Sequence, residues 1–435
     1  MALPGTERHD LQPPAGAGFL ATIVTLTFVM NMIARGVAES FAVFLLPVQA
    51  GLAATRAEMM VTYSVFAVAY AVSAPFVGQC IDRLGVRFTY GLGLGALGAG
   101  YLSAGYATTT WHYYVAAGLC GGIGAAALGM IVASSILSRW FVTRMGSIVS
   151  VPYAAAGTGM LIVPPVMQLL LQAYGWRSAH VVLGGFILAL LPVLLVLPLA
   201  RIGRGSEEWR QARAAQIQSA TGGWTVRTAL RTSAFWGLFS AYFWTSVAAY
   251  SILPQSVAYL IEQGFNPLVA ATAFGMTGML SAIGIVVVGW LSDRVGRLPT
   301  VTITYCITAA GAVALLSISA WPCLLLLYAF VICFGLMQGA RGPIIVALIA
   351  HLYRGGAVGS IFGMLSIAMG LGQAGGSFLS GLLQQWTGGY LASFSLGVVG
   401  SAMGLAMFWC VPSLRRESHG AAPTLPPVSP KRADR

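Results

Sequence analysis

The sequence is poor in charge. Only 8% of its 435 residues are Asp, Glu, Lys or Arg, while 57% are hydrophobic and the mean hydropathy is +0.81. A soluble domain carries roughly 25% charged residues, which form much of its polar surface. A chain of this length with so little charge cannot cover a water-soluble core. The composition therefore excludes a soluble protein and requires a hydrocarbon solvent.

The chain also lacks the patterns of several other classes. Its apolar stretches do not alternate as the strands of a membrane barrel do over about ten residues. Its six cysteines show no metal-ligand spacing, and no run of basic residues or cleavage site marks a signal peptide. Glycine-rich stretches lie inside apolar segments, without the preceding strand or the Walker lysine of a nucleotide-binding loop, so they do not indicate nucleotide binding. No nucleophile–base pair or carboxylate dyad is apparent, so we expect no enzyme, no cofactor and no metal.

Long apolar stretches are what the sequence has in abundance. A membrane helix needs about 20 apolar residues, and twelve such stretches are present, six on each side of a polar segment: 18–49, 58–78, 89–107, 111–138, 146–173, 179–200, 234–260, 267–290, 299–319, 322–350, 357–385 and 389–411. We predict an all-α membrane protein with two six-helix bundles, 1–200 and 233–411. A cytoplasmic linker, 201–232, joins them, and a disordered cytoplasmic tail, 412–435, follows.

Basic residues indicate the orientation. If the N-terminus faces the cytoplasm, only Arg56 and Arg177 fall on the outer side, and only Arg35 and Arg341 fall within the membrane. The other Lys and Arg residues all lie in cytoplasmic segments, as the positive-inside rule describes. The formal charge of +12 is therefore explained by topology and anionic lipid, not by nucleic acid. We expect a monomer in the cytoplasmic membrane with both termini inside the cell.

One loop occurs twice. Between the second and third stretches stands Gly78-Gln-Cys-Ile-Asp82-Arg83-Leu-Gly85-Val-Arg87, and 211 residues later stands Gly289-Trp-Leu-Ser-Asp293-Arg294-Val-Gly296-Arg297. A second echo is Tyr174-Gly-Trp176 before the sixth stretch and Trp386-Thr-Gly-Gly-Tyr390 before the twelfth. Repeats of this kind indicate two homologous bundles.

With these motifs the sequence resembles the major facilitator superfamily. Its G-x-x-x-D-R-x-G-x-R signature is matched in full at 78–87, and at 289–297 except that Arg297 directly follows Gly296. Arg139-Trp-Phe141 and Tyr174-Gly-Trp-Arg177 are similar to the monocarboxylate-transporter and oxalate/formate-antiporter subgroup. The resemblance implies twelve helices in two pseudo-symmetric bundles, a cavity lined by helices one, four, seven and ten, and alternating access. Each Asp–Arg loop would latch the cytoplasmic side. The Asp and Arg of the eighth helix of monocarboxylate carriers have no counterpart here.

Three ionisable residues lie deep in apolar stretches: Arg35, Glu39 and Arg341. Each would cost about 2.5–3.5 kcal/mol if it faced lipid, so we expect them to face a partner or a water-filled cavity. Asn31, Arg35 and Glu39 are spaced to share one helical face, as are Gln338 and Arg341.

Two arginines converging on one cavity would suit a small anionic solute. We therefore predict a secondary transporter of a small organic anion, most simply a monocarboxylate. Arg35 and Arg341 would bind the carboxylate, Asn31 and Gln338 would supply hydrogen bonds, and Glu39 would couple protons or gate. Tyr250 and Tyr114, with Tyr242 and Trp244, are aromatic candidates for the pocket.

Several alternatives remain open. Arg35 and Glu39 would equally form a closed pair that packs the bundle, and Arg341 would equally bond backbone carbonyls near Gly335, Gly339 and Gly342. Uncoupled exchange or uniport is an alternative to proton coupling. Proton-driven efflux of drugs or metabolites, and a sensor that keeps the fold without transporting, are alternative functions.

Overall fold

Helices form nearly all of the described chain. In a computed structural model of the protein, residues 16–141, 145–207, 209–211, 226–353, 358–412 and 414–415 are described, and none of these forms a strand. Residues 208 and 212–225 of the predicted linker 201–232, and most of the predicted tail 412–435, lie outside the described residues, so those two predictions stay predictions.

The N-terminal half contains six passes through the molecule, several of them built from more than one helix. Its elements are α1 (Ala17–Glu39), α2 (Phe41–Gly51), α3 (Arg56–Arg83), α4 (Gly85–Ala104), α5 (Thr110–Tyr113), the π-helix η1 (Tyr114–Cys120), α6 (Gly121–Leu128), α7 (Met130–Trp140), α8 (Met145–Ala189), α9 (Val193–Val196) and α10 (Leu199–Arg204). The long α8 holds the fifth and sixth passes, which meet at a sharp kink at Gly175 (φ 75°, ψ 171°).

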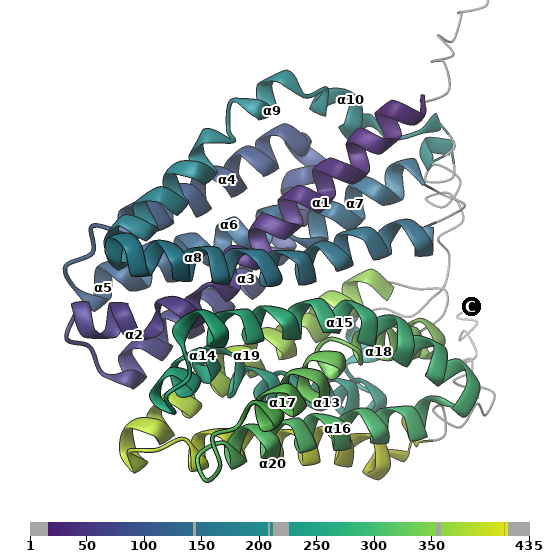
Figure 1. Cartoon of the computed structure of the whole chain (residues 1–435). Coiled ribbons are helices and arrows are strands. Elements are labelled where there is room, and N and C mark those ends of the chain that lie inside the picture. Colours follow the sequence, from purple (N-terminus) through teal and green to yellow (C-terminus); the bar gives the residue numbers. More distant parts are fainter. Residues whose placement is uncertain are drawn as a thin grey trace, which may run out of the picture.

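The C-terminal half repeats this order. Its elements are α12 (Val226–Ala229), α13 (Ser233–Tyr250), α14 (Leu253–Glu262), α15 (Pro267–Val295), α16 (Arg297–Ser317), α17 (Leu324–Met337), α18 (Gly342–Leu352), α19 (Val358–Thr387) and α20 (Leu391–Cys410). Figure 1 shows the two halves as two bundles, the N-terminal one above the C-terminal one. The predicted twelve-helix fold in two bundles is confirmed.

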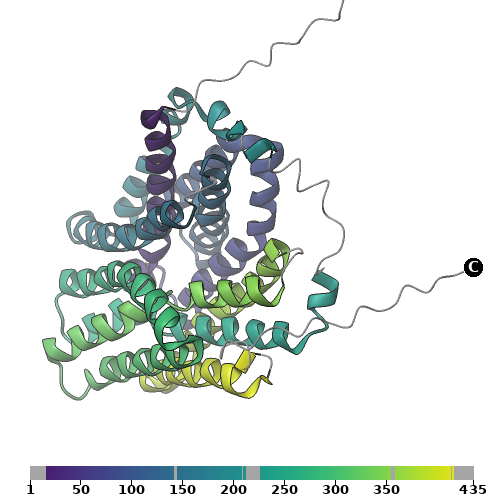
Figure 2. The same cartoon turned by 90° about the vertical axis from the view of Figure 1, so that its right-hand side faces the viewer.

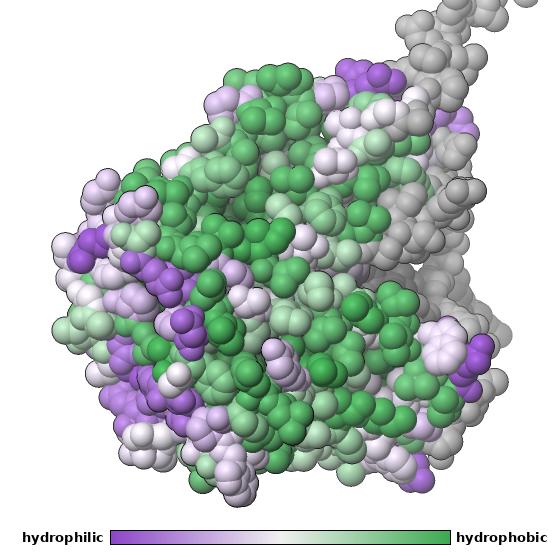
Figure 3. Space-filling view, viewed as in Figure 1, coloured by the Kyte–Doolittle hydropathy of each residue, from purple (hydrophilic) through white to green (hydrophobic). Residues whose placement is uncertain are grey.

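Apolar residues cover the middle of one face of the molecule (Figure 3). Figure 3 shows apolar residues across the centre of this face and polar residues gathered toward its two ends. Within the described residues, eight helical stretches are long and apolar enough to cross a membrane by themselves. Both ends of the described chain lie on one side, here called the terminus side (Figure 1). The opposite side, which holds the loops around Ala53, Gly264 and Gly388, is here called the far side.

The first and fourth passes of each half are interrupted. The first pass breaks at Ser40, between α1 and α2, and the seventh breaks at Ser251 and Ile252, between α13 and α14. The fourth contains η1 and an extended Gly129, and the tenth unwinds from Gln338 to Arg341. Interrupted helices of this kind, related by internal symmetry, typically form the binding sites of secondary transporters.

The two halves touch through matching pairs of helices. The second pass, α3, packs on the eleventh, α19, and the fifth, in α8, packs on the eighth, α15. Glycines permit the second contact, because a Cβ on Gly157 would lie 2.5 Å from the carbonyl oxygen of Gly278. On the far side α2 also packs on α14. Figure 2, viewed from the terminus side, shows the N-terminal half above the C-terminal half.

The duplicated loop adopts the same backbone turn in both copies. Gly85 has φ +84° and Gly296 has φ +94°, and each lies where one membrane helix ends and the next begins. Side-chain-bearing residues rarely adopt this left-handed conformation, because their Cβ approaches the carbonyl oxygen. The glycine shared by the two motifs is therefore needed for the turn.

This turn predicts that substitution of the two glycines of one motif affects the stability differently. Gly85→Ala should lower the stability by about 1–2 kcal/mol, because the left-handed conformation is strained while the space around the new Cβ is open. Gly78→Ala, in a helix and equally open, is the control and should be neutral or slightly stabilising. Thermal unfolding in detergent measures both changes in stability. Equal effects of the two substitutions would contradict the requirement for a glycine in this turn.

Candidate functional site

Arg35 and Tyr250 meet where two interrupted helices end. Arg35 lies four residues before Glu39, the last residue of α1, and Tyr250 is the last residue of α13. Nη2 of Arg35 donates a hydrogen bond to the Tyr250 hydroxyl at 3.0 Å and lies 2.8 Å from Oε1 of Glu39. The guanidinium thus joins the N-terminal half to the C-terminal half.

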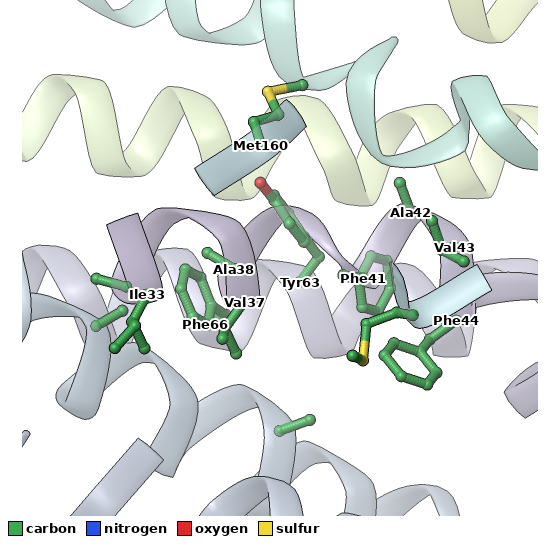
Figure 4. Close-up of a cluster of buried hydrophobic side chains, with 14 of the residues drawn as sticks. Ile33, Val37, Ala38, Phe41, Ala42, Val43, Phe44, Tyr63, Phe66 and Met160 are labelled. Atoms are coloured by element: carbon green, nitrogen blue, oxygen red, sulfur yellow. The ribbon is translucent and has the colours of Figure 1, made fainter. Parts of the chain in front are cut away.

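Two further polar residues complete the centre. The ring of Tyr63, on α3, lies 6.0 Å from the ring of Tyr250, and the Tyr63 hydroxyl accepts a hydrogen bond from Nε2 of Gln373, on α19, at 3.4 Å. Figure 4 shows Tyr63 among buried apolar side chains of the N-terminal half, with its hydroxyl pointing away from Phe66 and Phe41 and toward Met160. Arg35, Glu39, Tyr63, Tyr250 and Gln373 are here called the central cluster; they come from two helices of each half.

The two charges of the central cluster differ in exposure. The Glu39 side chain is 2% exposed and the Arg35 side chain is 34% exposed. A buried carboxylate beside a guanidinium remains favourable only as part of such a pair. The partly exposed guanidinium keeps donors that a solute can reach. The pair expected as one alternative is formed, but it is open on the Arg35 side.

Asn31 does not join the central cluster. Its side chain is 5% exposed and donates a hydrogen bond to the carbonyl of Pro152 in α8. The expectation that Asn31 lines the same site as Arg35 is therefore not met in this structure. Residues four apart share a helical side only approximately, and Asn31 uses its amide to tie α1 to α8.

Arg341 also lies elsewhere. It is 4% exposed, and its guanidinium donates to the Thr304 hydroxyl at 3.3 Å, to the Thr304 carbonyl at 3.1 Å and to the Thr308 hydroxyl, all on α16. It also stacks over the ring of Tyr305, with Cζ 4.1 Å from the ring centroid. The two arginines do not converge, because Arg341 is held inside the C-terminal half. Its carbonyl partner is Thr304 on α16, and not the carbonyls near Gly335, Gly339 and Gly342 that the alternative named.

Gln338 is separated from Arg341 by the break in the tenth pass. Gln338 is extended (ψ 118°) and Gly339 has φ +77°, so the helical spacing that would place Gln338 and Arg341 on one face is lost. The buried Oε1 of Gln338 has no hydrogen-bond partner among the described residues. The predicted shared face of Gln338 and Arg341 is lost because the helix is interrupted between them, and the periodicity of the sequence does not reveal this interruption.

The remaining aromatic candidates lie in different surroundings. Tyr114 begins η1 and packs against the exposed Trp111 at a centroid distance of 5.5 Å, near the far side. Tyr242 is buried and contacts the ring of Phe362, and Trp244 contacts Phe243. Within the described part of the chain, Tyr250 is the one predicted aromatic residue that contacts Arg35.

Sequence reasoning missed Tyr63 and Gln373. Gln373 places an amide in the middle of the apolar α19. Burial of an amide without a hydrogen-bond partner costs free energy, although less than burial of a charged group such as Arg35. Tyr63, Phe66 and Tyr70 follow one another at helical spacing on α3, and their rings stack at 6.0 and 6.5 Å. The polar amide within an apolar segment and the aromatic residues at helical spacing were the signals in the sequence that could have identified these two residues.

The first Asp–Arg loop pairs within its own half. Asp82 Oδ1 lies 2.6 Å from Nη2 of Arg139, whose Nη1 donates to the Gly203 carbonyl at 2.8 Å. Trp140 Nε1 donates to the Ile202 carbonyl at 2.7 Å. The Arg-Trp-Phe segment thus holds the first residues of the predicted linker against the end of α7.

The other loop residues are surface groups in this structure. Arg87 donates to the carbonyls of Leu195 and Leu197 at 3.4 and 3.5 Å, and Arg294 stacks on Trp290. The exposed side chains of Arg83 and Asp293 make no hydrogen bond or ion pair with other described residues. A latching role for the two loops, formed by Gly78, Asp82, Arg83, Gly85 and Arg87 and by Gly289, Asp293, Arg294, Gly296 and Arg297, stays a prediction.

Within the described residues no group of three or more His, Cys, Asp or Glu side chains is placed to hold a metal ion.

Comparison with known proteins identifies relatives over most of the chain. The sequence pattern of the Major Facilitator Superfamily matches residues 24–339. The chain is 26% identical to an uncharacterized MFS-type transporter, YcxA, of Bacillus subtilis, over 87% of this chain and 91% of that protein. It is 27% identical to monocarboxylate transporter 13 of Rattus norvegicus, over 89% of this chain and 87% of that protein.

A solved structure shares the fold. The xylose transporter XylE from E. coli, in a partially occluded inward open conformation, matches with a TM-score of 0.71 at 13% sequence identity, covering 91% of this chain and 98% of that one. At this identity the likeness shows the fold alone.

The contacts of Arg341 predict a structural role. Arg341→Gln should lower the stability by about 1–3 kcal/mol, because it leaves the buried acceptors on α16 without their donor. Thr308→Val removes one partner of the same network and should give a smaller loss of the same sign. Thermal unfolding in detergent measures both; an Arg341→Gln protein with unchanged stability would contradict this role.

Proposed function

The chain belongs to the major facilitator superfamily, and we propose that it carries a small organic anion, most simply a monocarboxylate, across the cytoplasmic membrane. The observation that supports this most is Arg35: a guanidinium at the meeting point of the two halves that is one-third exposed and bonded to both of them. Similarity to a protein named monocarboxylate transporter 13 agrees with the same substrate class.

Arg35 is suited to recognise a carboxylate. A guanidinium presents five N–H donors in a planar fork that matches two carboxylate oxygens. Glu39 and Tyr250 both contact the single nitrogen Nη2, so the other donors are available to a solute. Tyr63 and Gln373 supply hydroxyl and amide groups close by. In contrast to our prediction from the sequence, the proposed site uses one arginine and not two.

Glu39 provides a route to proton coupling. When Glu39 is ionised, the Arg35–Glu39 pair is neutral overall, and an anionic solute must approach a carboxylate. When Glu39 is protonated, the site carries one positive charge and accepts a monoanion. We propose that one proton and one monoanion are therefore taken up together, and that both charges remain balanced while the site is closed.

Movement between two states follows from the arrangement of the halves. The central cluster lies at the interface of the two bundles, and its residues come from both. Rocking of one bundle against the other would expose the cluster to each side in turn, which is alternating access. By the distribution of basic residues, the terminus side is proposed to face the cytoplasm.

Removal of the Arg35 charge tests the substrate class. Arg35→Gln in proteoliposomes should lower the uptake of a radiolabelled monocarboxylate at subsaturating concentration by about 10- to 100-fold, because a hydrogen bond to a charged group contributes about 1.5–3 kcal/mol. The control is Arg177→Gln, which removes the same charge outside the central cluster. A panel of carboxylates, sugars and amines identifies the substrate class; equal uptake by wild type and Arg35→Gln would refute the anion site.

Neutralisation of Glu39 tests the coupling. Glu39→Gln should keep exchange of labelled for unlabelled solute but lose the accumulation that an imposed pH gradient drives in the wild type, because the variant cannot bind or release the proton. Counterflow and gradient-driven uptake are measured in the same proteoliposomes. If the variant still accumulates solute when a pH gradient is applied, Glu39 is not the coupling group.

A further inference from the structure

A second charged pair joins the two halves on the far side. Arg56 is the first residue of α3, and its Nη2 lies 2.7 Å from Oε1 of Glu262, the last residue of α14. The Arg56 side chain is 5% exposed, whereas that of Glu262 is 37% exposed. Arg56 belongs to the N-terminal half and Glu262 to the C-terminal half, so the pair closes the interface between them.

Neighbouring contacts reinforce the closure at this position. The guanidinium of Arg56 lies over the ring of Tyr390, with Cζ 5.8 Å from the centroid. The backbone N–H of Ala57 donates to Oε1 of Gln385 at 3.2 Å. Arg56, Ala57, Glu262, Gln385 and Tyr390 are here called the far-side closure. The start of one helix of the N-terminal half thus meets three segments of the C-terminal half.

The start of α3 is built to present Arg56 in one place. Thr55 and Glu58 form a capping box: the Thr55 hydroxyl accepts from the backbone N–H of Glu58, and a Glu58 carboxylate oxygen accepts from the backbone N–H of Thr55 at 2.7 Å. The box leaves Glu58 occupied at the helix terminus. Glu262 is therefore the carboxylate that meets Arg56.

The electrostatics make this closure reversible. Nε and Nη1 of Arg56 are buried and have no hydrogen-bond partner among the described residues. Burial of a guanidinium whose N–H donors lack partners costs free energy, and the ion pair with a carboxylate offsets this cost. If the halves part on this side, Arg56 regains water at all its donors while the ion pair is lost. Hydration of Arg56 favours the open state and the ion pair favours the closed state, so the two contributions have opposite signs, as an element with two states requires.

The far-side closure and the central cluster share α3, α19 and the seventh pass, which contains α13 and α14. Arg56 and Tyr63 are seven residues apart on α3, which is about two helical turns, or roughly 10 Å. Glu262 ends α14, which follows Tyr250 directly after the break between α13 and α14. A movement that separates Arg56 from Glu262 therefore acts on α3, which carries Tyr63, and on α14, which continues the pass that carries Tyr250.

We propose that the Arg56–Glu262 pair is the gate that keeps the central cluster closed to the far side, and that its separation accompanies exposure of the cluster to that side. The proposal rests on alternating access in the proposed function, but it does not depend on the chemistry of the solute.

Distances between spin labels test the gate without any transport. The labels are placed at Trp111 and Trp386, which are 73% and 72% exposed on the far side of the two halves, in a background with the native cysteines replaced by serine. Pulsed electron spin resonance in lipid nanodiscs, without added solute, measures the distance distribution. Arg56→Gln and Glu262→Gln should each raise the ratio of long to short distances at least tenfold. Arg56→Lys should stay close to the starting protein.

Exchange of the two charges provides the decisive comparison. The double variant Arg56→Glu with Glu262→Arg should restore the short distances, while each single reversal should abolish them. Arg177→Gln is the control, since Arg177 donates to the Ala107 carbonyl within its own half. Unchanged distances in the neutralised variants, or a double variant no shorter than the single ones, would overturn the gate. Thermal unfolding confirms that each variant is folded, and a gate that fails leaves the uptake results for Arg35 unaffected.

Discussion

A guanidinium in the middle of a membrane must be paired, and this constraint organises the whole centre of the protein. The chain meets it in two ways. Arg341 is surrounded by hydroxyl, carbonyl and aromatic groups of a single helix, α16, and stays inside one half. Arg35 takes a carboxylate from its own helix and a hydroxyl from the other half, and remains partly exposed. The first arrangement ties Arg341 into one bundle, and the second leaves part of a guanidinium exposed where the two halves meet, which is the site that we propose for the solute.

Helix interruptions place these groups. Because α1 ends at Glu39 and α13 ends at Tyr250, the last turns of two helices meet at the interface of the halves. Each pass then continues to the far side as a short second helix, α2 or α14, and these pack on each other. The central cluster and the far-side closure are thus connected along the same passes, and we propose that both take part in one conformational change.

Much of the fold was predictable, and less of the site. The twelve apolar stretches and the duplicated loop indicated two homologous bundles, and the shared left-handed turns at Gly85 and Gly296 agree with that repeat. The buried charges at Arg35 and Glu39 were recognised from their cost alone. Gln338 and Arg341 were placed on one face because a continuous helix was assumed. The extended Gln338 interrupts that helix, and periodicity then no longer relates the two side chains.

By itself the sequence determined the solvent of this protein, its division into two repeated halves and the few polar groups that the membrane core must accommodate. Those properties depend on composition, on spacing along the chain and on the transfer cost of charge, all of which are local. Only the tertiary structure decided which neighbour each polar group meets: Asn31 ties α1 to α8, Arg341 binds α16, and Arg35 bridges the halves. The reason is physical, because a hydrogen bond needs a partner within about 3 Å, and the partners here lie more than thirty residues away along the chain.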